Sequence, residues 1–263
     1  MLIRFAEVLR DIARGGLAGL IAGLIVGGLG GRVAMMLAAR MNPGATGMFT
    51  ENGELIGAFT LNGTFALMIF GGLLLGLVAG IVWVVLSPWL PASGPRRRLA
   101  AGLLAAALGS SFLVQADNLD FAILGNDAAI IAMLVLLVGL IGLAMAWADD
   151  VLDRRLPRPG GHPIRYLLAY GLITTVGLVV VPMAIGLFVS RETCGCGNPP
   201  VFVGWALIGV GVLTASWWVM RITTGRTERP RALIAAGRLG VIAAAGLGAI
   251  HLASEVSDIL ARA

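Results

Sequence analysis

The chain has 263 residues, of which 58% are hydrophobic and only 13% charged, with a mean hydropathy of +0.93. This composition is too apolar for an ordinary soluble domain, so it indicates an all-α, polytopic integral membrane bundle. The formal net charge of +5 rests on arginines that lie in short segments between apolar runs. That arrangement is typical of membrane orientation and argues against a nucleic-acid partner.

The residue types that are missing exclude several kinds of chemistry. All 19 basic residues are arginine, so no lysine is available for the Schiff base of a retinal pump. Only two histidines occur, His162 and His251, which is too few for paired axial ligation of several haems. Nucleotide-loop, zinc-helix and serine-elbow motifs are absent, as are paired carboxylates within a span. We therefore assign no catalytic, metal-binding or cofactor-binding residue, expect no cofactor, and expect a protein that is not an enzyme.

Residues 1–14 are predicted to form an amphipathic helix at the membrane interface. Leu2, Phe5, Leu9 and Ile12 share one helical face, and charged residues occupy the others. A cleaved signal peptide is the alternative, but the apolar run that follows lacks a small-residue cleavage site.

Residues 15–263 are predicted to form one transmembrane domain with about seven spans. A span needs about 20 mostly apolar residues. The segments of that kind are 15–39, 63–86, 99–116, 128–148, 164–189, 201–220 and 232–253. Arginines cluster before the first span and after the second, fourth and sixth, which predicts a cytoplasmic N-terminus and an outer C-terminus. We place the protein in the cell inner (plasma) membrane, with the lipid bilayer as its surroundings.

The first span carries a ridge of glycines at every fourth position. In water each interior glycine costs a helix about 1 kcal/mol relative to alanine, but in a bilayer a glycine groove lets another helix approach closely. The ridge consists of Gly15, Gly19, Gly23, Gly27 and Gly31. It predicts a buried packing helix.

The last span carries a similar small-residue ridge, made of Ala232, Ala236, Gly240, Ala244 and Gly248. Two arrangements are open. Either the two ridges face each other and close the bundle, or they form a seam between copies of the chain or with another membrane protein. Packing is favoured over the lining of a pore in both cases.

Polar residues gather at the predicted outer ends of three spans. They are Arg32, Gln115, Asp117, Asp120, His251 and Glu255. If these side chains converge, Arg32 pairs with one of the acids in a partly buried cluster. In the alternative, Arg32 extends to the lipid headgroups and the carboxylates are solvated.

Two further features are given structural interpretations. Asp150 and Arg154 have the i, i+4 spacing of a local ion pair, so the acids Asp149, Asp150 and Asp153 predict a paired helix end rather than a metal site. Cys194 and Cys196 lie in a predicted outer loop, where a disulfide is chemically favoured but strained by the one-residue spacing. We interpret them as a structural or incidental pair.

Two functions are favoured over a third, a membrane enzyme that acts at the outer face through His251, Glu255 and Asp117. The dry, small-residue spans favour a non-enzymatic scaffold or accessory subunit that packs against itself or a larger membrane complex. The acidic outer loops favour, as the alternative, a permease or channel for a small solute or cation.

Overall fold

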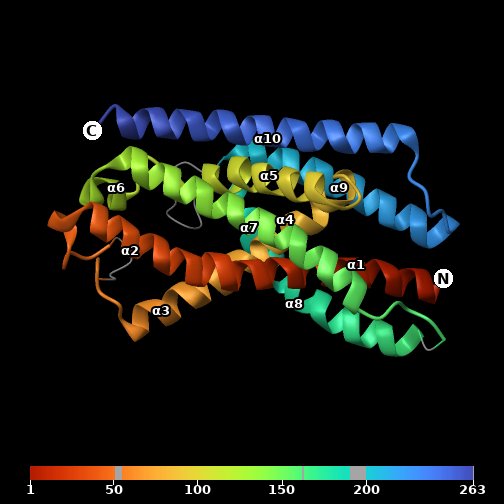
Figure 1. Cartoon of the computed structure of the whole chain (residues 1–263). Helices are drawn as coiled ribbons and strands as arrows, with labels where there is room; N and C mark the ends of the chain where they lie inside the picture. The colour runs from red at the N-terminus through yellow and green to blue at the C-terminus, as the bar shows by residue number, and fades with distance from the viewer. Residues whose placement is uncertain (51–54, 162, 190–199, 263) are drawn as a thin grey trace.

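The computed structural model describes residues 1–50, 55–161, 163–189 and 200–262, and within them the chain is a bundle of long helices with no named strand (Figure 1). The all-α membrane class is therefore confirmed. A single antiparallel bridge joins Phe49 to Leu55 in the loop after the first span.

The first part of the chain forms two long helical paths that run side by side. The first path is α1 (Leu2–Ala22), η1 (Gly23–Gly30) and α2 (Gly31–Met41). After the short turn η2 (Pro43–Ala45), the second path is α3 (Leu61–Leu67), η3 (Met68–Leu74), α4 (Leu75–Leu86) and η4 (Ser87–Trp89). Both η1 and η3 are π-helical, and they pack against each other.

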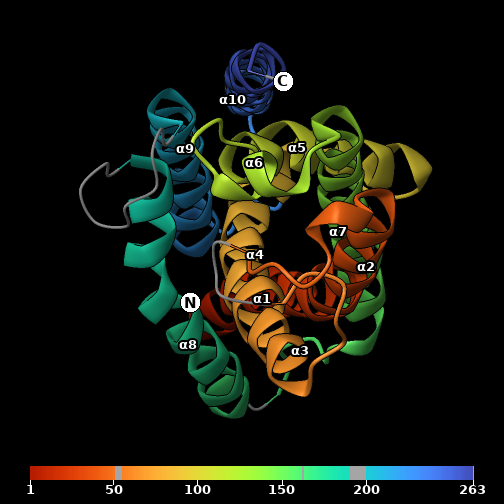
Figure 2. The same cartoon turned by 90° about the vertical axis from the view of Figure 1, so that its left-hand side faces the viewer.

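The remaining helices surround this pair. They are α5 (Pro95–Leu113), the short α6 (Leu119–Leu124), α7 (Asp127–Arg155), α8 (Pro163–Val189), α9 (Val201–Thr224) and α10 (Arg231–Leu260). α1 packs chiefly against α4, α7 and α8, whereas α10 packs chiefly against α5 and α9. The view along the bundle places α10 at its edge (Figure 2).

Six helical segments of the described chain are long and apolar enough to cross a membrane: Leu2–Met41, Leu61–Trp89, Asp127–Arg155, Pro163–Leu187, Val201–Thr224 and Arg231–Leu260. The chain is thus a multi-pass membrane protein. The predicted span 99–116 falls on α5, which has 19 residues and carries three arginines in its first turn. α5 nevertheless lies alongside α7, and the two termini lie at opposite ends of the bundle (Figure 1).

The N-terminal segment differs from the interfacial helix that we predicted. α1 continues through residue 14 without a break. Its apolar residues Leu2 and Phe5 are exposed, whereas Arg10 is only 6% exposed. The charged face of α1 therefore packs into the bundle, because it finds partners of opposite charge there.

The glycine ridge of α1 and η1 packs against a second ridge on the neighbouring path. The backbone of Gly19 lies against Gly80, and that of Gly23 lies against Gly72 and Gly76. A methyl group on Gly76 would lie only 2.9 Å from the carbonyl oxygen of Gly19. We call this contact the glycine seam. It brings two backbones together at the centre of the bundle, an approach that any side chain would prevent.

The small-residue ridge of α10 is used only in part. Ala244 and Gly248 are buried, and a methyl group on Gly248 would lie 2.7 Å from the carbonyl oxygen of Ala107 in α5. Ala232 and Ala236 are exposed. The expectation that the two ridges face each other is therefore wrong, because this face of α10 is turned to α5 and α9.

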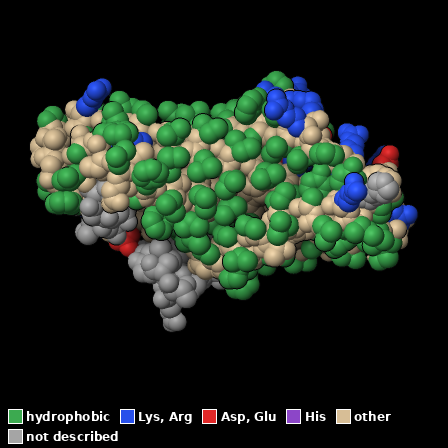
Figure 3. All heavy atoms as spheres, turned by 90° about the horizontal axis from the view of Figure 1, so that it is seen from below, with side chains coloured by type: hydrophobic (Ala, Val, Ile, Leu, Met, Phe, Trp, Pro, Cys, Tyr) green, Lys and Arg blue, Asp and Glu red, His purple; other side chains and the backbone are tan. Residues whose placement is uncertain are grey.

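The surface has the charge distribution of a membrane protein. Hydrophobic side chains cover the middle of the face in Figure 3, and basic side chains gather mainly toward its right-hand end. That end also carries the N-terminus in Figure 1. This asymmetry is what the positive-inside rule requires if this end faces the cytoplasm.

Candidate functional site

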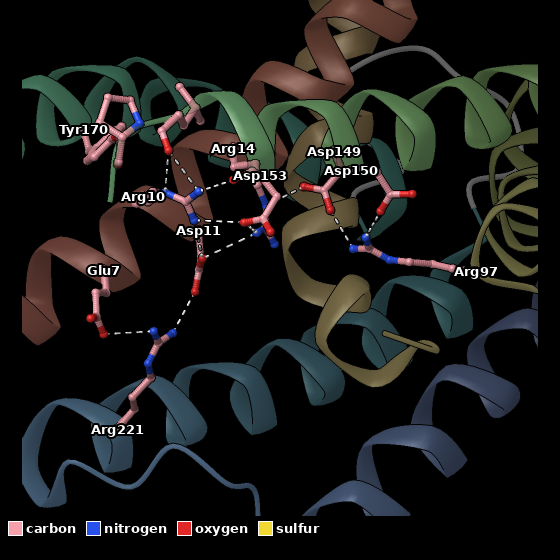
Figure 4. Close-up of polar contacts among 12 residues, drawn as sticks. Glu7, Arg10, Asp11, Arg14, Arg97, Asp149, Asp150, Asp153, Tyr170 and Arg221 are labelled. Atoms are coloured by element: carbon pink, nitrogen blue, oxygen red, sulfur yellow. Dashed lines mark hydrogen bonds and ion pairs between the residues drawn. The ribbon is translucent and has the colours of Figure 1, made fainter. Parts of the chain in front are cut away.

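Charged side chains from four helices meet inside the bundle near the N-terminal end (Figure 4). We call this group the ion-pair network. Its members are Glu7, Arg10, Asp11 and Arg14 of α1, Arg97 and Arg98 of α5, Asp149, Asp150 and Asp153 of α7, and Arg221 of α9. Arginines and acids occur in equal number, which leaves the network formally neutral.

Asp149 joins two helices to α7. One carboxylate oxygen accepts a hydrogen bond from Nε of Arg14 at 2.7 Å, and the other accepts one from Nη2 of Arg97 at 2.6 Å. The Asp149 side chain is 1% exposed. Nη1 of Arg97 also donates to Asp150 at 2.7 Å, so this guanidinium bridges neighbouring carboxylates.

Arg10 and Arg14 share the next acid along α7. Asp153 Oδ1 lies 3.0 Å from Arg10 Nη1 and 2.6 Å from Arg14 Nη1. Arg10 also donates to the backbone carbonyls of Asp153 at 2.6 Å and Leu156 at 3.1 Å. Asp153 lies in the last turn of α7 and Leu156 directly follows the helix, so Arg10 caps that helix end.

The network extends to α9 through Arg221. Its guanidinium donates to Asp11 at 2.7 Å and to Glu7 at 3.0 Å. Beside the network, the hydroxyl of Tyr170 in α8 donates to the carbonyl of Pro157 at 2.6 Å, which ties α8 to the segment after α7.

Helical spacing explains why these side chains meet. Residues 7, 10, 11 and 14 follow the i, i+3, i+4, i+7 pattern and therefore share one face of α1. Asp149 and Asp153 likewise share a face of α7. Charges inside a bundle are stable only when they are paired, because removing an ion from water costs several kcal/mol. The network thus holds α1, α5, α7 and α9 in one arrangement.

The expected local pair between Asp150 and Arg154 is wrong in its partner, because Asp150 bonds to Arg97 and Arg98 of α5. The sequence did contain a signal that the acids of α7 pair with the charged face of α1. The charged stripe on residues 7–14 and the acids on α7 both lie at the predicted cytoplasmic edge. Among the described residues no group of three histidine, cysteine or acidic side chains is placed to hold a metal.

The predicted outer polar cluster is only partly brought together. Glu255 is 4% exposed and accepts a hydrogen bond from the backbone N–H of Ala116 at 2.7 Å, next to Gln115 and Asp117. His251 Nε2 lies 3.9 Å from Glu255 Oε1. The end of α10 is thereby joined to the end of α5.

Arg32 lies apart from these acids, so both expectations for it are wrong. The side chain is buried at 5% exposure rather than extended, and it makes no ion pair with a carboxylate of the described chain. Nη2 donates to the carbonyl of Ala58 at 2.8 Å, and the guanidinium lies 5.1 Å from the ring centroid of Phe59. The height of Arg32 was predictable, but its direction around the helix was not.

Asp120 is half-buried, and its backbone N–H bonds to Asn118.

Cys194 and Cys196 lie outside the described residues. The hydroxyl of Thr214 in α9 accepts a hydrogen bond from Nε1 of Trp89 at 2.9 Å and lies 2.9 Å from the carbonyl oxygen of Val85.

Comparison with protein-family models, with curated proteins and with solved structures gave no match for this chain.

Proposed function

We propose that this protein is a non-enzymatic scaffold or accessory subunit of a membrane complex. The observation that carries the proposal is the glycine seam, in which the helices at the centre of the bundle pack backbone to backbone. Gly19, Gly23 and Gly76 leave no room for a solute at that level. A permease needs a wet route at this depth, whereas a scaffold needs a rigid, dry centre.

The ion-pair network supports the same function. Its charges satisfy each other, and Asp149 and Asp150 are both buried against Arg97. A proton-coupled carrier uses carboxylates that lose and regain protons. Carboxylates locked between guanidiniums favour a fixed structure.

The outer helices offer surface for a neighbour. Among the six apolar segments, α8 and α10 are the least buried: 17% and 22% of the most apolar stretch of each lies inside the bundle. Their exposed faces are apolar, with Leu168, Val179 and Ile250 among the most exposed side chains. Lipid or another membrane protein covers such faces, and an accessory subunit requires them.

Two measurements on wild-type protein test the proposal. In mildly solubilised native membranes, the chain should migrate in a complex larger than its 27.2 kDa monomer. Purified protein in liposomes should give no flux of protons, potassium ions or small neutral solutes above protein-free vesicles.

The Asp149→Asn variant shows whether assembly requires the folded bundle. It weakens the fold without altering the exposed faces of α8 and α10, so it should yield less complex than wild type, whereas nonspecific aggregation should increase. Saturable solute flux would replace the scaffold by the permease alternative. A monomer in native membranes would contradict the proposal even without flux.

A further inference from the structure

An open hollow of about 560 Å³ lies at the loop that joins α9 to α10. It is lined by residues 225–231, among them Arg226, Arg229 and Arg231. The loop lies at the same end of the bundle as the N-terminus (Figure 1). A phosphate-bearing headgroup fits this volume.

Trp89 lies against two positively charged segments, the loop that carries Arg229 and the part of α10 that carries Arg238. The guanidinium of Arg229 lies 5.8 Å from the ring centroid of Trp89. The backbone of α10 at Gly237 contacts the same ring so closely that a methyl group there would collide with it. Arg238 follows directly on α10. Trp89 is thus the common neighbour of both positively charged segments.

These arginines differ from those of the ion-pair network in lacking a counter-charge. Within the described chain, none of Arg226, Arg229, Arg231 and Arg238 forms an ion pair, although Glu228 lies in the same loop. Burial, together with the nearby charge of Arg238, lowers the pKa of Arg229. The protein therefore holds like charges together, an arrangement that an anion would stabilise.

Neighbouring groups add to the positive field. A methyl group on Gly225 would lie 2.6 Å from the guanidinium carbon of Arg4, which places that arginine at the rim of the hollow. α10 begins at Arg231, and the preceding residue, Pro230, gives it no side-chain cap. Its first backbone N–H groups are thus free to complement an anion that the arginines attract.

We propose that Arg229 and Arg238, beside Trp89, bind the phosphate group of an anionic phospholipid headgroup. Guanidinium groups match phosphate oxygens in geometry and charge, and the buried ring of Trp89 supports the guanidinium of Arg229 from one side. Basic pockets between helices at a membrane surface are suited to such headgroups. The inference does not depend on the proposed scaffold function.

Native mass spectrometry of the purified full chain provides the test, with dioleoyl-phosphatidylglycerol titrated against dioleoyl-phosphatidylcholine. The R229Q/R238Q variant should bind phosphatidylglycerol roughly 30-fold more weakly than wild type, because it removes two charge-assisted hydrogen bonds to the phosphate, each worth about 1 kcal/mol. The matched control is R155Q/R158Q, which removes the same charge from exposed positions elsewhere at that end. It should retain the wild-type affinity within about threefold, because nonspecific attraction alone is altered.

R229K/R238K keeps the charge and guards against loss by misfolding, so it should recover most of the binding. A further arm adds inorganic phosphate: displacement of the lipid at millimolar phosphate would support the phosphate site and assign it to a free anion. Equal affinity of R229Q/R238Q and wild type for phosphatidylglycerol would overturn the inference. Equal binding of phosphatidylcholine and phosphatidylglycerol to wild type would overturn it as well.

Discussion

Asp149 shows how one buried side chain controls several helices. Both of its oxygens accept bonds from guanidiniums that belong to different elements, Arg14 of α1 and Arg97 of α5. The sequence revealed the acids on α7 as a group but not their partners. The i, i+4 rule favours a local pair, whereas burial rewards the pair that also satisfies α1 and α5.

We expect Asp149→Asn to destabilise the protein by about 3 kcal/mol, because it leaves the buried guanidinium of Arg97 and the partly buried one of Arg14 without their shared counter-charge. Thermal unfolding in lipid nanodiscs, followed by tryptophan fluorescence, measures the effect. Asp258→Asn, at an exposed position on α10, is the control and should change stability little. Equal stability of wild type and Asp149→Asn would show that the network contributes nothing.

Thr214 is a second residue whose role depends on a neighbour. Thr214→Val should cost about 1–3 kcal/mol, because it leaves Nε1 of buried Trp89 without an acceptor. The loss should be much smaller in a Trp89→Phe background, where that donor is already gone. A double-mutant cycle on the unfolding free energy makes the comparison, and additive losses would rule out the bond as the cause.

At the scale of the element, the period of the glycines predicted a close helix contact but not its partner. Periodicity fixes which residues share a face, and the partner depends on how the helices are arranged around each other. The second ridge, Gly72, Gly76 and Gly80, has the same four-residue spacing and was readable in the sequence. In the ridge of α10, Ala232 and Ala236 are exposed, so their packing against another chain stays a prediction.

The seam offers a matched pair of substitutions on one helix. Gly19→Ala should destabilise the protein by about 1–3 kcal/mol, because its methyl group meets the backbone of Gly80. Gly16→Ala places a methyl group where no atom lies within 4 Å, so it should be neutral or stabilise by up to about 1 kcal/mol through helix propensity. Unfolding by sodium dodecyl sulfate gives both values. The same sign for the two variants would mean that the seam does not depend on close backbone contact.

At the scale of the whole molecule, composition was sufficient to predict a helical membrane bundle, and the periodic apolar segments located most of its long helices. The sequence did not show what the charged face of the N-terminal segment contacts, because an amphipathic pattern does not tell whether the polar face meets headgroups or other charges. Arg32 illustrates the same difficulty at the other end: its depth follows from residue count, but its neighbours Ala58 and Phe59 follow only from the path of a loop.

The orientation of the bundle remains a prediction that reporter fusions can check. A reporter after residue 97 should lie in the cytoplasm, and reporters at residue 50 and at the C-terminus should lie outside, because the arginine-rich segments stay inside. A cytoplasmic C-terminus would mean that α5 does not cross the membrane.

If the middle of the bundle is dry and closed, as the glycine seam indicates, water does not reach the side chains beside the seam. Single cysteines at Ala18 and Ala22, which are 0% and 1% exposed beside the glycine seam, are introduced after Cys194 and Cys196 are changed to serine. Arg226→Cys, at an exposed loop position, is the positive control. In native membranes a charged, membrane-impermeant thiol reagent should modify residue 226 from its own side and neither residue 18 nor residue 22 from either side. Modification at 18 or 22 would reveal a wet route through the bundle and contradict the account.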